Sequence, residues 1–379
     1  MVERVDFLVV GRGLMGSACA RWLAEAGHGV LLVGPDEPED RRGCEGPFAS
    51  HHDAARITRQ VAHDQVWSAL SSASIARYRD LEARSGVAFF HEVGAMMAGR
   101  YSPAMSAFTA GLEQSAADVG AARLGAAEVR AQFGFVLPED AVVSYEASKA
   151  GWIDPRALRL AQEVLAKASG VRVIRQSVTA LDTRVVRLTS GDEIQADHIV
   201  WATGAYAGTD GLLPMTPAMD VFARTIAFAE VAGPIPGMPT LIWVPEDVED
   251  DLYMLPPIRY PDGRWLMKIG GEIDSPQLRN SQEMSAWFQG SARADAGARL
   301  LGQLRRLLPD VPWIGTHFEP CAVAFTQTGY PYIERISDTL TLLTGGNGAG
   351  AKCCDELGRL GALVAQGDKV PGFEARFIT

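Results

Sequence analysis

The chain has few cysteines, and none of them stands at a spacing that binds metal. Only five occur among 379 residues, and no CxxC pair is present. Irregular spacing argues against a disulfide framework, and the missing CxxC pairs leave no structural zinc motif. We therefore predict no metal site, and we interpret the adjacent pair Cys353 and Cys354 as helix packing.

Long apolar runs and an excess of positive charge are also missing. No run approaches the ~20 residues needed to cross a bilayer, and the N-terminus shows no signal peptide. Lys and Arg number 35 against 46 Asp and Glu, a formal net charge of −11. This balance argues against nucleic acid or an anionic membrane as partner. We expect a cytoplasmic protein that is a monomer or a small homo-oligomer.

The first motif that is present is a glycine-rich turn. An apolar run at 5–10 leads into Gly11-Arg12-Gly13-Leu14-Met15-Gly16, then a helical segment and a second apolar run at 28–34. Strand, GxGxxG, helix and strand within ~30 residues are typical of a dinucleotide-binding unit, whose helix N-terminus faces the pyrophosphate. The predicted cofactor-binding residues here are Gly11, Gly13, Leu14, Met15 and Gly16.

The acidic residue that usually follows the second strand of this unit is absent. Gly34 stands in its place, although an acid there normally binds the ribose hydroxyls. Asp36, two residues further on, could reach the same hydroxyls from the loop, or it could be a solvated turn residue. We predict Asp36 as a cofactor ligand and leave the second reading open.

Two later segments have the same character. Asp154 and Pro155 are typical of a helix start, and the strands that follow end at Ala202-Thr203-Gly204. Near the C-terminus a strand runs into a glycine loop at 345–350 and a helix at Lys352. The cofactor-binding residues predicted from these segments are Thr203, Gly204, Gly346, Gly348, Gly350 and Lys352.

The order of these segments predicts an α/β fold. One Rossmann-like cofactor-binding domain would be assembled from three segments, 1–85, 151–214 and 318–379. Residues 86–150 and 215–317 mix strands and helices, and the run LYMLPPI pairs with RWLMKIGG through a PDG turn. These residues would form an inserted, mostly antiparallel-sheet substrate domain.

Seven motifs occur in one order along the chain: GRGLMG (11–16), SHHDAARITR (50–59), ATGAY (202–206), LYMLPP (252–257), LMKIGG (266–271), PCAVAFT (320–326) and GGNGAGAK (345–352). In this order the chain resembles the sarcosine-oxidase-like enzymes of the D-amino-acid-oxidase superfamily of FAD-dependent amine oxidases. The resemblance covers essentially the whole chain. It implies an FAD-binding domain, a small amino acid or amine as substrate, and O2 as electron acceptor.

The resemblance also implies roles for single residues. Ser50, His51 and Arg56 would contact FAD, and His52 and Arg56 would act at the reacting centre. Arg59, Tyr253 and Lys352 would bind substrate, the first and last through its carboxylate. A solvated basic loop is the alternative for the stretch at 50–59.

Lys268 lies in an apolar strand, where a lysine either reaches water at the sheet edge or faces an active site. Alternation places it on the same strand face as Leu266, opposite Trp265, Met267 and Ile269. The resemblance implies that Lys268 lies over the flavin and that its charge assists oxygen reduction.

Cys321 stands in a strand that runs into a Gly-Tyr-Pro-Tyr turn. The resemblance implies a thioether from Cys321 to the flavin 8α-methyl group, for which a nearby cation would supply thiolate character. An inert strand cysteine beside noncovalent FAD is the alternative.

Two positions depart from the family pattern. Glu272 stands where the family has a histidine, and Val323 where it has a tyrosine. We place Glu272 in the substrate pocket and expect a substrate other than sarcosine. The predicted function is an FAD-dependent oxidase of N-substituted (secondary) or cyclic amino acids that produces an imine and H2O2. Alternatives are a flavin dehydrogenase of the same fold that passes electrons to a quinone or partner protein, and a flavin-binding subunit of a larger oxidase complex.

Overall fold

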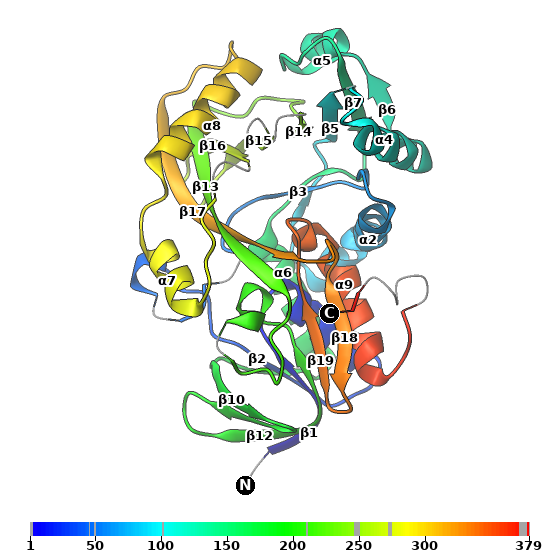
Figure 1. Cartoon of the computed structure of the whole chain (residues 1–379), viewed down its shortest axis with the longest axis vertical. Coiled ribbons are helices and arrows are strands. Elements are labelled where there is room, and N and C mark those ends of the chain that lie inside the picture. The colour runs from blue at the N-terminus through cyan, green and yellow to red at the C-terminus, as the bar shows by residue number, and fades with distance from the viewer. Residues whose placement is uncertain are drawn as a thin grey trace.

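Two large sheets make up most of the protein. The computed structural model describes residues 3–44, 46–48, 51–100, 102–209, 211–245, 251–271, 275–370 and 377–378. One sheet lies in the lower half of Figure 1, near the N-terminus, and the other lies in the upper half. The long strands β13 (Met219–Val231) and β17 (Gly315–Thr326) extend from the upper half toward the lower one.

The lower sheet has a parallel core of β9, β2, β1, β12 and β19. Antiparallel β10 and β11 extend it beside β12, and β18 pairs with β19. The short strands β2 and β19 are wholly buried, as apolar strands covered on both faces are. The strands are β1 (Glu3–Val10), β2 (Val30–Val33), β9 (Arg172–Ile174), β10 (Val178–Asp182), β11 (Val185–Leu188), β12 (Glu193–Trp201), β18 (Tyr332–Ser337) and β19 (Leu340–Thr344).

Helices from the start, middle and end of the chain pack together beside this sheet. They are α1 (Leu14–Glu25), α6 (Pro155–Ala168) and α9 (Gly350–Gln366), with α1 against both of the others. Asp154 caps α6, as predicted, and accepts hydrogen bonds from the N–H groups of Arg156 and Ala157. Helices α2 (Gln65–Ile75) and α3 (Tyr78–Ser85) lie next to this group, and short 3-10 turns occur at Arg41–Gly43 (η1) and Gly204–Gly208 (η2).

The upper sheet has the order β17-β13-β16-β15-β14-β5-β7-β6. Its neighbours are antiparallel except β14 and β5. The predicted hairpin is present as β15 and β16. The remaining strands are β5 (Ala95–Arg100), β6 (Ala122–Leu124), β7 (Ala141–Glu146), β14 (Thr240–Val244), β15 (Leu252–Arg259) and β16 (Trp265–Gly270); the helices of this half are α4 (Ser106–Val119), α5 (Ala126–Phe133), α7 (Ser281–Gln289) and α8 (Ala294–Leu307).

A small third sheet joins chain segments that are far apart in sequence. Strand β8 (Gly151–Ile153) pairs with β3 (Arg56–Thr58) and β4 (Phe90–His91). The architecture is the predicted one, a Rossmann-like domain assembled from three segments with an inserted, mostly antiparallel sheet. The domain boundary that we placed at 317/318 falls within β17, which pairs with β13 along its whole length.

Candidate active site

A cavity of about 1340 Å³ lies between the two large sheets. Its walls include the glycine turn before α1, the loop after β2, the segment at 202–206 and the glycine loop before α9. Strands β13, β14, β15 and β17 of the upper sheet contribute the other walls. The volume exceeds the ~300–1,000 Å³ usual for one small ligand, so a cofactor and a substrate can share it.

The glycine turn before α1 is shaped for close backbone approach. Gly11 has φ of +113°, and a Cβ there would lie 2.2 Å from the Ala202 carbonyl oxygen. A Cβ at Gly16 would lie 1.8 Å from the Gly11 carbonyl oxygen. Gly13 is the N-cap of α1, has no side-chain cap and lines the cavity with Leu14 and Met15. Gly16 therefore acts in packing, whereas the other four predicted residues of the turn lie at the cavity wall.

The missing acid at position 34 has a steric reason. A Cβ at Gly34 would lie 2.6 Å from the Arg12 Cβ. Arg12 is buried between Glu163, 2.7 Å from its Nε, and Asp36, 2.7 Å from its Nη1. Asp36 lines the cavity, and its contact with the ribose stays a prediction.

The segments at 203–204 and 346–350 complete this part of the wall. Thr203, Gly204, Gly346, Gly348 and Gly350 all line the cavity. The Thr203 hydroxyl is buried and has no hydrogen-bond partner in the described part of the chain. An orphaned hydroxyl and an uncapped helix N-terminus on one wall are the donors and acceptors that a dinucleotide needs. The residues present therefore fit FAD.

Cys321 and Arg56 line the cavity from different sheets. Cys321, on β17, is half-buried, and its carbonyl accepts a hydrogen bond of 2.6 Å from Trp287 Nε1. Burial lowers the pKa of Arg56, but Asp53, Cys321 and Tyr253 raise it more, so the pKa stands above its usual value. Arg56 is therefore a cation in the neighbourhood of the Cys321 side chain.

Lys268 lies behind the cavity wall. It is 1% exposed and is not among the residues that line the cavity. Its Nζ donates to an Asp53 carboxylate oxygen and to the Ala55 carbonyl oxygen, the latter at 3.0 Å. The predicted alternation is confirmed, because Met267 and Ile269 pack in the core of the upper sheet while Leu266 packs with Ile226 and Phe228.

The two adjacent histidines differ in environment. His51 is buried at the cavity wall, and burial lowers its pKa to about 3. His52 does not line the cavity; its ring nitrogens contact Glu37 and Arg156 instead. Burial raises the pKa of Glu37, but hydrogen bonds from His52 and Arg156 lower it to about 2. The structure therefore does not bring His52 to the expected reacting centre, because this ion cluster holds its ring.

Arg59 directly follows β3, and Lys352 lies in the first turn of α9. They are 9% and 5% exposed, and both line the cavity. The Arg59 Nε has no hydrogen-bond partner, and neither side chain has an ion pair within the described residues. Burial and Arg59 lower the pKa of Lys352 to about 8, against opposing effects of Cys353 and Glu146. Tyr253 also lines the cavity, and burial raises its pKa.

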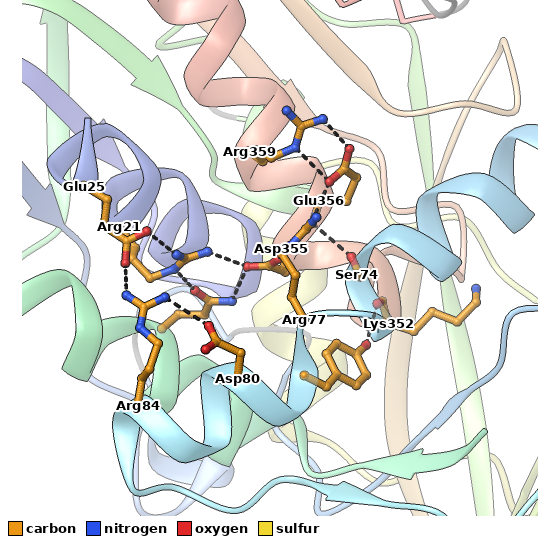
Figure 2. A network of polar contacts seen from close by, with 12 residues as sticks. Arg21, Glu25, Ser74, Arg77, Asp80, Arg84, Lys352, Asp355, Glu356 and Arg359 are labelled. Carbon is orange, nitrogen blue, oxygen red and sulfur yellow. Dashed lines mark hydrogen bonds and ion pairs between the residues drawn. The ribbon is translucent and has the colours of Figure 1, made fainter. Parts of the chain in front are cut away.

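A buried ion network fixes α9 and therefore the backbone of Lys352. Figure 2 shows Asp355 between Arg21 and Arg77, which lie 2.7 and 2.5 Å from its two carboxylate oxygens. The Tyr78 hydroxyl also donates to the Lys352 carbonyl oxygen, at 2.5 Å. These bonds connect α9 to α1 and α3, so the start of α9 is a rigid support.

Two predicted residues, Ser50 and Glu272, lie outside the described residues. Conversely, the sequence reasoning missed Asp53, although it is the one acid among the histidines and arginines of 51–59. It also missed Arg224, which lines the cavity and is the strand partner of Cys321 in the pairing of β13 with β17. Four apolar side chains that the sequence did not indicate as site residues also line the cavity: Trp67, Met97, Phe108 and Ile242.

Neither a metal cluster nor a membrane-spanning segment is found among the described residues. No group of three or more His, Cys, Asp or Glu side chains there could hold a metal ion. None of the helices in that part of the chain combines the length and the apolar character that crossing a bilayer requires.

Comparison with known proteins gives consistent results. A family model described as FAD dependent oxidoreductase matches residues 6–363. N-methyl-L-tryptophan oxidase of Yersinia pestis is 23% identical over 380 residues, covering 97% of this chain and 96% of that one.

Among solved structures, NikD, described as an unusual amino acid oxidase essential for nikkomycin biosynthesis, superposes with a TM-score of 0.77 at 23% identity, covering 100% of this chain and 98% of that one. L-proline dehydrogenase from P. horikoshii gives 0.76 at 17%, with coverage of 100% and 97%. These likenesses confirm the predicted fold class.

Proposed function

The chain belongs to the family of FAD dependent oxidoreductases, and from this membership we propose that it oxidises an amino acid whose nitrogen is secondary or part of a ring. The predicted family and enzyme class are thereby confirmed. The bound flavin supplies the redox chemistry, accepting a hydride equivalent from the carbon next to nitrogen. The protein's own part is to bind, orient and shield the substrate.

One observation carries the proposal: Arg59 and Lys352 are buried at the cavity wall without a carboxylate partner among the described residues. A buried charge without a counterion costs several kcal/mol, even after the protein relaxes around it. A substrate carboxylate would offset that cost. Arginine binds a carboxylate with two parallel N–H groups, and the Arg59 Nε is one N–H still unused.

Glu146 acts on the charges of both Arg59 and Lys352, but it forms no ion pair with either among the described residues. Glu146 carries the charge opposite Arg59, but its two oxygens accept hydrogen bonds of 2.9 Å from the N–H groups of Gln60 and Val61. Its carboxylate therefore fixes the backbone next to Arg59. The Arg59 Nη1 donates to the Val61 carbonyl oxygen, and Nε remains available to a ligand.

The nature of the amine rests on the relatives and on the apolar part of the wall. The relatives are named as oxidases or dehydrogenases of N-methyl-L-tryptophan, of an amino acid and of L-proline. Trp67, Met97, Phe108 and Ile242 provide an apolar surface that suits a carbon-rich side chain or ring. Such a surface also excludes water from the reacting carbon.

FAD would be held by the glycine turn, Asp36, Thr203 and the loop before α9. We further propose a thioether between the Cys321 sulfur and the flavin 8α carbon, formed with loss of the thiol S–H and of one methyl C–H; the two electrons would pass to the flavin and then to O2. The half-buried thiol at the wall and the adjacent Arg56 cation support it. After denaturing electrophoresis the flavin should remain with the polypeptide, and Cys321→Ser should release it. Freely extractable flavin from the wild-type protein would contradict the bond and leave the fold unaffected.

The acceptor of electrons is proposed to be O2, with H2O2 as product. A dehydrogenase is the second candidate, because Lys268 lies behind the wall with its ammonium bound to Asp53. The test is to mix purified protein with N-methyl and cyclic amino acids, first without oxygen and then with it. Anaerobic bleaching of the flavin that is much faster with an amino acid than with its decarboxylated amine supports the substrate class. Equal bleaching by the bare amine contradicts it, and bleaching without oxygen consumption favours the dehydrogenase.

A further inference from the structure

Asp53 is a buried carboxylate at the centre of the polar cluster behind the cavity. One of its oxygens, Oδ2, accepts from both the Lys268 ammonium and the Arg56 guanidinium. The other, Oδ1, accepts from the Tyr260 hydroxyl at 3.1 Å and from the Ala54 N–H at 2.7 Å. All four contacts leave the carboxylate fully occupied, so it has no free position for a ligand.

The charges around Lys268 come from several elements. Arg56 and Asp53 approach from β3 and the loop before it, and the Tyr253 ring on β15 lies 5.6 Å from Nζ. Cys321 on β17 also acts on the ammonium. Asp53 is the one carboxylate that contacts Lys268 in the described residues.

We propose that Asp53 is a positioning residue for the oxidation reaction: its carboxylate joins Lys268 and Arg56 in one ion triad and thereby keeps a fixed positive charge beside the flavin. The proposal rests on the proposed function, because it takes the cavity as the flavin site. Arg56 is the member of the triad that reaches the wall, next to Cys321 and Tyr253. Lys268 supports it from behind.

The charge state of Lys268 depends on this carboxylate. Burial lowers the pKa of Lys268, and so does the Arg56 cation, whereas Asp53 raises it by charge and by hydrogen bond. Removal of the Asp53 charge leaves only the smaller effect of Cys321 against the two lowering effects. Lys268 would then lose its proton at a lower pH, and the triad would lose a positive charge.

A second buried carboxylate with two cations offers a matched control. Asp355 binds Arg21 and Arg77 and is 0% exposed, but it lies on α9 and does not line the cavity. Asp53→Asn and Asp355→Asn therefore remove the same charge from similar surroundings. Only the first should move the pH inflection of the flavin, because Lys268 contacts Asp53 and not Asp355.

The experiment uses holoenzyme reduced with dithionite, so that no substrate is needed. Its reoxidation by O2 and the midpoint potential of the bound flavin are measured from pH 6 to pH 10. In Asp53→Asn the inflection of both pH profiles, the reoxidation rate and the midpoint potential, should move to a pH lower by about one unit or more. Above the new inflection, reoxidation should then be about tenfold slower than in the wild-type protein. Asp53→Glu, which keeps the charge but displaces it, should give an intermediate position, and Lys268→Met should remove the inflection.

An unchanged inflection in Asp53→Asn, or a loss that is equal at every pH and is matched by Asp355→Asn, overturns the proposal. If Asp53→Asn holds no FAD, the Asp53→Glu profile decides: an inflection at the wild-type position contradicts the triad. A wild-type protein that binds no FAD refutes the proposed function instead. A wild-type protein whose reduced flavin does not react with O2 refutes only the oxidase activity. The midpoint potential of the bound flavin, measured against pH, still tests Asp53.

Discussion

Two cationic clusters border the same cavity, and only one of them contains its own carboxylate. In the Asp53 cluster, Lys268 and Arg56 share the Asp53 carboxylate. In the Arg59 cluster, Arg59 and Lys352 share none within the described residues. The Asp53 cluster therefore has its counterion within the protein. Under the proposed function, the carboxylate of the substrate completes the second cluster, whereas the first tunes the cofactor.

Of the changes that test this comparison, removing Arg59 should have the largest effect on activity. Arg59→Ala leaves a bound carboxylate with one buried partner fewer, at a cost of ~2–5 kcal/mol. We expect kcat/KM for the amino acid to fall by roughly 30- to 5,000-fold. The decarboxylated amine, measured in the same assay, should be affected little. If both substrates lose equally, Arg59 supports the fold and does not bind a carboxylate.

Removing Lys268 should affect the other cluster and the other half-reaction. Preorganised charge in a dry site is worth several kcal/mol, so Lys268→Met should slow reoxidation by O2 by about 10²-fold. Reduction by the amino acid should change much less. Stopped-flow measurement of the two half-reactions separates them. Comparable losses in both would assign Lys268 to folding or to substrate positioning.

The pH dependence should distinguish the clusters more finely. Lys352 has its pKa lowered to about 8, with burial as the main cause. Below that pH its charge attracts a carboxylate, and above it the charge is lost. We therefore expect kcat/KM for the amino acid to fall about tenfold above pH 8. Lys352→Met should abolish this step, whereas a step retained in that variant must come from another group.

The smallest effect should come from the support of α9. Tyr78→Phe removes the hydrogen bond to the Lys352 carbonyl oxygen and should lower the free energy of unfolding by about 1 kcal/mol. The midpoint of urea unfolding measures the loss. The ratio of kcat/KM for acid and amine should stay within about threefold, because the Lys352 side chain is retained. A larger change would mean that the hydrogen bond from Tyr78 sets the position of the Lys352 ammonium.

The glycine motifs were the most predictable part of the molecule. Close backbone approach leaves a local mark in sequence, so Gly11, Gly13 and the loop at 345–350 could be placed at the cavity from spacing alone. The period-two pattern likewise gave the correct face for Met267 and Ile269. Both signals are local, and the structure needed only to bring the segments together.

Side-chain partners were much less predictable. His52 and Asp53 are neighbours, yet their partners Arg156 and Lys268 lie 104 and 215 residues away in sequence. No local pattern reports such pairings. The reason for Gly34 was hidden as well, since it depends on the side chain that Arg12 places beside it.

The place of α9 in the fold has a consequence for biosynthesis. This final helix packs against α1, and a Cβ at Gly358 would lie 2.5 Å from the Cβ of Ala18. Arg21 of α1 is 1% exposed and finds its buried carboxylate in Asp355, more than three hundred residues later. During synthesis α1 can therefore pack against α6 early, but Arg21 gains its buried carboxylate only when α9 emerges from the ribosome. We expect the nascent chain to acquire its cofactor only after α9 has emerged, and chains cut short before residue 350 to remain colourless.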